Sequence, residues 1–297
     1  MSARKMHEGE VDIDAALVRE LVAAQFPQWA ALSIDEVRST GTVNAIYRLG
    51  DATYVRLPRI ERWARDLEKE LRWLPVLAAQ LPLAVPEPVA TGAPGLGYPF
   101  SWAIYRWLAG DTFSRERIDD ECRAAEALAQ FVATLRCIDP SGAPRSSRDR
   151  PLPEKDAATR AAIASSRGAI DTDAVIAAWN ASLRAPVWEG NPVWVHGDLL
   201  PPNLLVRNGR LRAVIDFGSV GVGDPAVDVI PAWSVFGTDG RAAFRAALDV
   251  DDATWARGRG LALHQALLII PYYSKTNPAF VTMAVRTLDQ VLADSAA

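Results

Sequence analysis

The first hundred residues alternate between helical spacing and short apolar runs. Apolar side chains recur at helical spacing over residues 12–32 and again over 63–80, which predicts two amphipathic helices. Pro75 lies inside the second pattern and is expected to bend or break that helix. Between the two helices, short apolar runs predict an antiparallel meander of strands at 34–38, 45–49 and 53–57. A small sheet flanked by helices is therefore expected in this part of the chain.

Beyond an apolar strand predicted over 102–108, helical spacing dominates the pattern. The stretch 140–156 is rich in Pro, Ser and Arg and predicts an exposed loop. One compact β segment follows, with Asn208-Gly209 as a strong hairpin signal and strands predicted at 193–195, 204–206 and 211–215. We expect an α+β fold with two lobes. The N-terminal lobe, residues 1–108, is built on a small antiparallel sheet with a helix, and the larger lobe, residues 109–297, is mostly helical.

The composition is that of a folded globular protein. Of its 297 residues, 49% are hydrophobic and 23% are charged, so the chain can bury a core and is long enough for two lobes that share a cleft. The net charge of -4 gives no positive field for nucleic acid or for an anionic membrane surface. No run approaches the roughly 20 apolar residues of a membrane span, and the polar N-terminus lacks the apolar stretch of a signal peptide. We expect a cytoplasmic protein with no nucleic-acid or membrane partner.

Polar residues interrupt the predicted strands in one segment, VWVHGDLLPPNLLVRNGRLRAVIDFGSVGVGDPAVD. Its HGDLLPPN sequence has the spacing of a kinase catalytic loop, H-x-D-x-x-x-x-N, and DFG follows one hairpin later. The two loops leave neighbouring strands, so their carboxylates and amide are expected to converge. Oxygen ligands suit Mg²⁺, and we predict that Asn203 and Asp216 hold magnesium on a nucleoside triphosphate. Asp198 then orients a substrate hydroxyl and accepts its proton as the catalytic base.

Each of these motifs occurs by chance in many proteins when it stands alone. A histidine before a turn is most often a buried structural residue, and we expect that role for His196. In register across an Asn-Gly hairpin, and followed by GDPAVD, the two motifs together favour a kinase. A protein kinase is disfavoured because no activation segment with an APE-like ending follows Asp216. A P-loop kinase is disfavoured because the sequence has no GxxxxGK[ST] motif.

These motifs, with the runs YRLGDATYVRLPR and LPLAVPEPVATG, make the sequence similar to the aminoglycoside phosphotransferase family over nearly the whole chain. The resemblance implies a protein-kinase-like fold and the transfer of phosphate from ATP or GTP to a small hydroxylated molecule. Gly197, where protein kinases usually have arginine, favours this small-molecule branch. The resemblance also implies that Asp224 and Asp228 cap and brace the helix after the metal loop.

By the same resemblance, the N-terminal lobe binds the nucleotide. Arg56, in YVRLP, occupies the position of the strand lysine that kinases usually place on the phosphates, and no lysine lies on a predicted strand of this lobe. A guanidinium can clamp phosphate oxygens but is not equivalent to an ammonium group. Glu70, on the following helix, is the expected partner of Arg56. An ordinary exposed strand arginine and helix glutamate would be the structural alternative.

Two further nucleotide contacts are expected from position and resemblance. The base is expected to bind the backbone of the strand that joins the lobes, at Arg106 and Leu108. The turn between the first two strands is expected to cover the phosphates with backbone N–H groups, although a plain hairpin turn explains it equally well. Its candidate residues are Ser39, Thr40, Gly41 and Asn44.

The acceptor is expected beside Asp198, against the helical lobe. A cationic aminoglycoside would need carboxylates, for which the candidates, also typical of helix caps, are Glu189, Asp239, Asp249, Asp251 and Asp252. A macrolide would favour aromatic surfaces, for which the candidates, also typical of a core, are Trp179, Trp188, Trp233, Trp255, Tyr272 and Tyr273. The loop at 140–156 is a candidate for part of the acceptor wall.

Three functions stay open from the sequence. The first is a kinase for an antibiotic of the aminoglycoside or macrolide type, which would act in antibiotic resistance. The second is a kinase for a metabolite such as an amino sugar or a choline-like alcohol. The third is a catalytically silent nucleotide-binding protein, for which the arginine at position 56 is the one supporting feature. A monomer and a homodimer fit the sequence equally.

Overall fold

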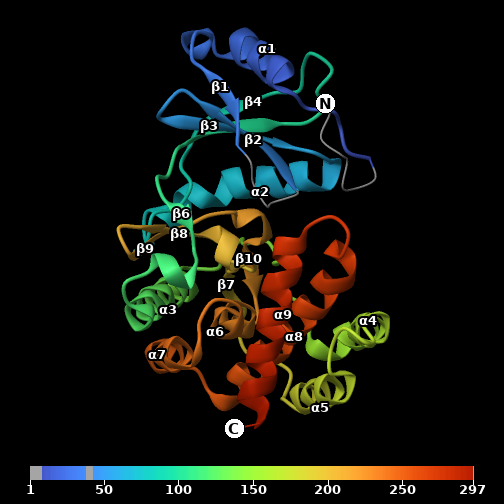
Figure 1. Ribbon diagram of the computed structural model, residues 1–297. Coiled ribbons are helices and arrows are strands. Elements are labelled where there is room, and N and C mark those ends of the chain that lie inside the picture. Colours follow the sequence, from blue (N-terminus) through green and yellow to red (C-terminus); the bar gives the residue numbers. More distant parts are fainter. Residues whose placement is uncertain (1–8, 38–42, 297) are drawn as a thin grey trace. The chain divides into compact units, whose positions relative to one another are not determined.

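The computed structural model describes residues 9–37 and 43–296 and divides the chain into two compact units (Figure 1). The first unit contains the residues up to Ala79 together with Ala84–Ala109. The second contains Gln80–Leu83 and the residues from Gly110 onward. Among the described residues, no helix combines the length and the hydrophobicity needed to span a membrane.

The first unit is built on a five-stranded antiparallel sheet with strand order β1-β2-β3-β5-β4. In chain order its elements are α1 (Ala15–Gln25), η1 (Pro27–Trp29), β1 (Ile34–Glu36), β2 (Asn44–Leu49), β3 (Thr53–Pro58), α2 (Glu61–Ala78), β4 (Pro88–Gly92) and β5 (Trp102–Arg106). The sheet register places Ile46 of β2 and Ala103 of β5 on either side of Arg56 in β3. Arg56 therefore sits on a central strand.

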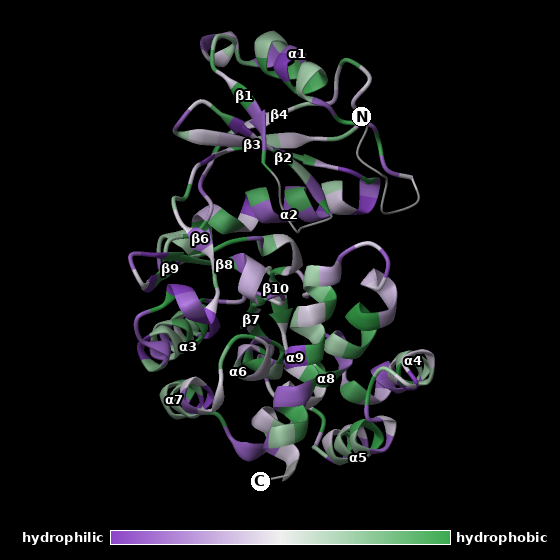
Figure 2. Cartoon of the chain, in the orientation of Figure 1, coloured by the Kyte–Doolittle hydropathy of each residue, from purple (hydrophilic) through white to green (hydrophobic). Residues whose placement is uncertain are grey.

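The alternation of side chains along β3 assigns its two faces. Val55 and Leu57 are fully buried in an apolar cluster with Leu21 and Val22 of α1. Arg56 points to the opposite face, where it meets Glu70 of α2. Hydrophilic and hydrophobic residues alternate along α2 (Figure 2), as expected for a helix that buries one side.

The second unit is mostly helical and carries two small sheets. Its elements are β6 (Asp111–Thr112), η2 (Arg115–Arg117), α3 (Glu121–Cys137), α4 (Leu152–Ser165), α5 (Thr172–Leu183), β7 (Val193–Val195), η3 (Pro201–Asn203), β8 (Leu204–Arg207), β9 (Arg210–Val214), η4 (Phe217–Ser219), β10 (Gly221–Gly223), η5 (Pro225–Val229), α6 (Pro231–Ser234), α7 (Thr238–Leu248), α8 (Asp252–Tyr273) and α9 (Pro278–Ala296). Helix α3 packs along α7, and α8 packs along α9 (Figure 1). The sheets β6-β8-β9 and β10-β7 lie where the polar motifs of the sequence fall.

The elements depart from the hydrophobic pattern at several places. Helix α4 begins at Leu152, inside the stretch predicted as an exposed loop, and β4, β6 and β10 were not predicted as strands. Two further differences concern the helices of the first unit. The first helix is shorter than the predicted 12–32, because Asp14 caps its start by accepting a hydrogen bond from Leu17 N at 2.8 Å and Pro27 follows its end. The expected break at Pro75 is absent, since α2 continues from Glu61 to Ala78 with Pro75 inside it. Buried Leu74 and Leu77 flank the proline and hold this last turn onto the core.

Candidate active site

The loop after β7 is folded tightly around a glycine. His196, Gly197 and Asp198 connect β7 to η3, and Gly197 has a φ of 85°. A Cβ atom at this glycine would lie 3.1 Å from both Cβ and the carbonyl oxygen of Ser219 and 3.2 Å from Oγ of Ser146. The glycine in HGD is thus required both by the left-handed backbone and by the close approach of two neighbouring segments.

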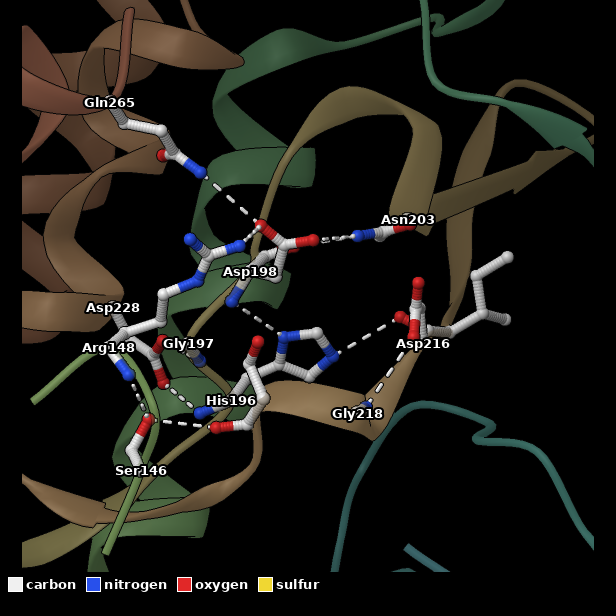
Figure 3. Close-up of polar contacts among 12 residues, drawn as sticks. Ser146, Arg148, His196, Gly197, Asp198, Asn203, Asp216, Gly218, Asp228 and Gln265 are labelled. Carbon is white, nitrogen blue, oxygen red and sulfur yellow. Dashed lines mark hydrogen bonds and ion pairs between the residues drawn. The ribbon is translucent and has the colours of Figure 1, made fainter. Parts of the chain in front are cut away.

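Hydrogen bonds hold both carboxylate oxygens of Asp198 (Figure 3). Asn203 donates its side-chain N–H groups to Oδ2 of Asp198 at 3.0 Å and to the backbone oxygen of Asp198 at 2.9 Å. From the other side, Gln265 of α8 donates to Oδ1 at 3.3 Å, and Arg148 lies 3.5 Å from the same oxygen. Burial raises the pKa of Asp198, the positive charge of Arg148 opposes this rise, and the negative charge of Asp216 adds to it.

Asp228 holds the backbone of the same loop. It is fully buried and accepts hydrogen bonds from His196 N at 2.6 Å and from Gly197 N at 2.9 Å. Burial raises the pKa of the Asp228 carboxyl, although the neighbouring His196 and these bonds oppose the rise. Its helix-bracing role implied by resemblance is therefore wrong in one respect, because its oxygens bond across to the catalytic loop. Asp224 does cap η5, by accepting from Ala226 N at 2.8 Å, and it also binds the guanidinium of Arg257.

His196 is a buried structural residue of the loop. Its Nδ1 accepts a hydrogen bond from Asp198 N at 3.2 Å, so its Nε2 carries the proton and donates to Ile215 O at 3.2 Å. Its ring meets Phe217 edge to face, with the centroids 4.6 Å apart. Burial lowers the pKa of this imidazole and keeps it neutral. The bond from His196 to Ile215 O joins the loop of Asp198 to the loop of Asp216.

The second loop brings Asp216 to the same place. Asp216 follows β9 with left-handed backbone angles, φ 64° and ψ 72°, and its Oδ1 accepts from Gly218 N at 3.5 Å. Ile215 N donates to the backbone oxygen of Asn203 at 2.9 Å, which ties the two loops directly together. The structure thus brings together Asp198, Asn203 and Asp216, as the motif spacing predicts.

The donor set of these loops suits a small, hard cation. The amide nitrogen of Asn203 faces Asp198, so its carbonyl oxygen is directed away from Asp198 (Figure 3). Together with the Asp216 carboxylate it offers oxygen ligands of the kind that Mg²⁺ prefers. No group of three His, Cys, Asp or Glu side chains in the described part of the chain forms a metal cage. Phosphate oxygens and water would therefore have to complete a magnesium shell here, as in nucleotide-dependent enzymes.

Arg56 and Glu70 form a buried pair in the first unit. Nη1 of Arg56 lies 2.8 Å from each carboxylate oxygen of Glu70, and the side chains are 7% and 0% exposed. With its amide oxygen turned toward the guanidinium, Asn44 accepts from Nε at 2.9 Å and from Nη2 at 3.0 Å. The Tyr105 hydroxyl donates to Glu70 Oε1 at 2.8 Å. The exposed alternative for this pair is therefore excluded.

The structure gives less information about the other residues predicted to contact the nucleotide. Ser39, Thr40 and Gly41 lie outside the described residues. Arg106 ends β5, where its backbone N–H donates to Glu87 O at 2.8 Å and its exposed side chain pairs with the Glu87 carboxylate at 2.8 Å. Leu108 lies just beyond β5 and makes no backbone hydrogen bond with the rest of the described chain.

Several acceptor candidates have structural roles instead. Asp251 caps α8 through Thr254 N, Asp252 pairs with Arg245, and Asp249 ends α7 in a left-handed conformation. The tryptophans at 179 and 233 are fully buried, and each donates its indole N–H to an aspartate. The sequence missed Arg148 and Gln265 as neighbours of Asp198 because neither belongs to a motif.

The chain is similar in sequence to a known family of enzymes. Residues 36–261 match the model of the phosphotransferase enzyme family known as APH. The chain belongs to this family, and the resemblance found in the sequence is confirmed. Membership makes it a phosphotransferase, and it does not identify the acceptor.

Solved structures of this family share the fold. The GDP complex of wild-type aminoglycoside 2'-phosphotransferase-IIIa is 18% identical, with a TM-score of 0.74 over 95% of this chain and 100% of that one. Macrolide 2'-phosphotransferase type I is 19% identical, with a TM-score of 0.62 over 95% and 98% of the two chains. These likenesses confirm the α+β fold, an antiparallel sheet followed by a mostly helical part. A curated relative, the uncharacterized protein YcbJ of Bacillus subtilis (strain 168), is 39% identical over 51 residues, which span 17% of its length and 17% of this chain.

Proposed function

We propose that the protein transfers the γ-phosphate of ATP or GTP to a hydroxyl group of a small molecule. Asp198 acts as the catalytic base, and Asn203 and Asp216 hold Mg²⁺ on the nucleotide. The observation that carries this proposal is the convergence of the three side chains on two loops that are joined by the Ile215–Asn203 backbone bond.

The reaction needs little covalent chemistry from the protein. The acceptor oxygen bonds to the γ-phosphorus while the bond from that phosphorus to the β,γ-bridging oxygen breaks, which leaves the nucleoside diphosphate. Asp198 orients the hydroxyl and takes its proton, and its rigid hydrogen bonds hold it in place for this task. A bound magnesium ion supplies charge neutralisation on the phosphates. Asn203 thus serves two purposes, because its nitrogen binds the base and its oxygen would be available to hold the cation.

The first unit is proposed to bind the nucleotide through Arg56. Glu70 and Asn44 bind the guanidinium and Tyr105 holds Glu70, so the arginine fulfils the geometric requirement of the usual lysine and glutamate pair. Relatives support a nucleotide ligand, since one was solved as a GDP complex and another as a streptomycin and ATP ternary complex. The preserved pair disfavours the silent alternative.

The acceptor is proposed to be an antibiotic or a hydroxylated metabolite. Solved relatives include complexes with kanamycin and gentamicin and a macrolide phosphotransferase, and these ligands belong to those proteins. An antibiotic acceptor would make the protein a resistance enzyme. A metabolite acceptor, such as an amino sugar or a choline-like alcohol, would use the same base and the same cation.

Two variants separate catalysis from nucleotide binding. Asp198→Asn should lower phosphate transfer by about 100- to 10,000-fold, which is the usual contribution of a general base, while nucleotide-dependent thermal stabilisation persists. Asp216→Asn should abolish the magnesium-dependent part of that stabilisation. Asp173→Asn, which removes an exposed carboxylate in the first turn of α5, is the control. Near wild-type transfer by Asp198→Asn, or no stabilisation of the wild type by ATP or GTP with magnesium, would refute the proposal.

A further inference from the structure

The side of Asp198 opposite Asn203 carries positive charge. Arg148 approaches Oδ1 at 3.5 Å, beside the amide of Gln265 (Figure 3). The Arg148 side chain is 49% exposed and the Asp198 side chain is 21% exposed, so both are partly open to solvent. A substrate hydroxyl that donates to Oδ1 would have to share this oxygen with Arg148 or displace the arginine from it. The arginine is therefore a neighbour of any acceptor that Asp198 serves.

The loop of Arg148 is firmly held, although the sequence predicts an exposed loop there. Ser146 N donates to Val222 O at 3.0 Å, and Val222 N donates to Pro144 O at 2.8 Å, which adds the loop to the edge of β10. The buried Ser146 hydroxyl donates to Ser219 O at 2.8 Å and accepts from Arg148 N at 3.2 Å. The position of Arg148 is thus fixed by the same segments that surround Gly197.

A second cation lies nearby on α4. Lys155 is partly buried and forms no ion pair with a described residue. Burial lowers the pKa of Lys155, and the positive charges of Arg148 and Arg150 lower it further, more than Asp149 and Glu154 oppose this. A half-buried lysine without a carboxylate partner is costly unless something else neutralises it.

The same two positive charges act on His264, which lies near Lys155 and Arg148. Burial lowers the pKa of His264 to about 4, and the charges of Lys155 and Arg148 contribute to this shift. His264 precedes Gln265 on α8, and its Nδ1 lies 2.8 Å from the hydroxyl of Thr159 on α4. The loop of Arg148 and helix α4 therefore bring two cations close to the stretch of α8 that contains the neutral His264 and Gln265.

The nearby carboxylates do not offset this charge. Asp149 is paired with Arg145 and accepts from Asp224 N at 3.0 Å, so its oxygens are engaged. Glu154 is exposed at the start of α4. Asp251 caps α8, Asp252 pairs with Arg245 and Asp249 ends α7, so these three acids have structural roles. A polycationic acceptor would meet Arg148 and Lys155 without compensating carboxylates from these segments.

We propose that the acceptor is a hydroxylated small molecule that carries an anionic group, a carboxylate or a phosphate, bound by Arg148 and Lys155 while its hydroxyl contacts Asp198. This inference rests on the proposed function, because Asp198 has to be the base. When the anion binds, Arg148 exchanges the Asp198 carboxylate for the anion of the acceptor, which frees Oδ1 for the hydroxyl. The products are the phosphate ester of the hydroxylated anion and a nucleoside diphosphate.

A series of sugars that share the glucose ring and differ in charge tests the preference. Glucuronate, glucose 6-phosphate, glucose and glucosamine are titrated into the full-length protein with magnesium and a non-hydrolysable ATP analogue, and phosphate transfer from ATP is measured in parallel. We expect glucuronate or glucose 6-phosphate to bind more tightly than glucose, and glucose more tightly than glucosamine. The two anions distinguish a carboxylate site from a phosphate site.

Arg148 variants assign the preference to this site. Arg148→Gln should weaken binding of the anionic sugar about 10- to 100-fold, the usual contribution of a charge-assisted hydrogen bond, and leave glucose unchanged. Arg148→Glu should reverse the order and favour glucosamine. Arg160→Gln is the matched control, because Arg160 is 45% exposed and is paired with Asp156. Melting temperatures near that of the wild type show that the variants fold.

Three results would overturn the inference. They are glucosamine binding the wild type as tightly as the anionic sugars, no binding of either anion, and Arg148 variants that change all four sugars equally. The last result would mean that Arg148 positions Asp198 and does not bind the acceptor. Magnesium-dependent nucleotide stabilisation that Asp216→Asn abolishes would in each case preserve the proposed function, whereas its absence from the wild type would refute that function first.

Discussion

The buried pair in the first unit makes a strong prediction about stability. Replacing Arg56 by methionine leaves the Glu70 carboxylate fully buried without its cation, while the Tyr105 hydroxyl still donates to it. Breaking a buried ion pair by removing one partner costs about 3–5 kcal/mol. The carboxyl can limit this cost by taking up a proton, which for an ordinary glutamic acid costs about 4 kcal/mol at pH 7. Arg56→Met should therefore lower the free energy of unfolding by about 4 kcal/mol at pH 7.

The deficit of Arg56→Met should depend on pH. Protonating a carboxyl of ordinary pKa costs only about 1 kcal/mol at pH 5, so the deficit of Arg56→Met should shrink to about that value. The sign follows because the variant raises the folded-state pKa of Glu70 above its unfolded value. Stability is then lost as the pH rises. Urea unfolding followed by tryptophan fluorescence at the two pH values measures the difference.

Three controls separate charge from packing. Arg56→Met combined with Glu70→Gln removes both charges and should recover most of the loss at pH 7. Arg56→Lys keeps a cation and should cost less than methionine, because it retains one contact to Glu70. Arg65→Met breaks an exposed pair with Glu61 and should cost at most about 0.5 kcal/mol. A deficit of Arg56→Met that is equal at pH 7 and pH 5, or that persists in the double variant, would refute the reasoning.

Two other positions give independent predictions. Gly197→Ala should destabilise the protein by about 1–3 kcal/mol and slow phosphate transfer, because its Cβ would crowd Ser219 and Ser146 in a left-handed backbone. Gly168→Ala is its control, since Gly168 has a φ of 83° with open space around it; equal losses in both would show that backbone strain alone is responsible. His264→Gln should flatten the acid side of the stability profile. The pKa of His264 is lowered from 6.5 to about 4 by folding, so the wild type should lose about 2 kcal/mol between pH 7 and pH 5, and an equal loss in the variant would contradict this.

The catalytic segment was predictable because it is local. The motif HGDLLPPN and the DFG of Asp216 are separated by one hairpin, and the Asn208-Gly209 turn that closes it has positive φ at both residues. Short range pairing leaves few arrangements, so the spacing alone brings Asp198, Asn203 and Asp216 together. The extents of the helices were less predictable. Capping by Asp14 sets the start of α1, and packing lets α2 continue past Pro75, and periodicity reports neither.

The partner of Arg56 came from resemblance, and its remaining contacts came only from the structure. Tyr105 is 35 residues from Glu70 in the chain, and it reaches Glu70 because β5 lies beside β3. Asn44 reaches the guanidinium from β2 in the same way. Alternation along a strand predicts which face a residue occupies, but sheet order decides which side chains share that face.

The α+β class and the residues of the phosphate-transfer motifs follow from the sequence alone, because they depend on periodicity and short spacings. The family follows from the resemblance of those motifs to known members. Tertiary structure decided the surroundings of Asp198. Arg148 and Gln265 lie 50 and 67 residues from it, on a loop and a helix with no motif. Asp228, 31 residues from Gly197, holds the loop backbone and does not brace its own helix. Such contacts are long in sequence and depend on how β10, α4 and α8 pack, so the charge offered to an acceptor appears only in the folded chain.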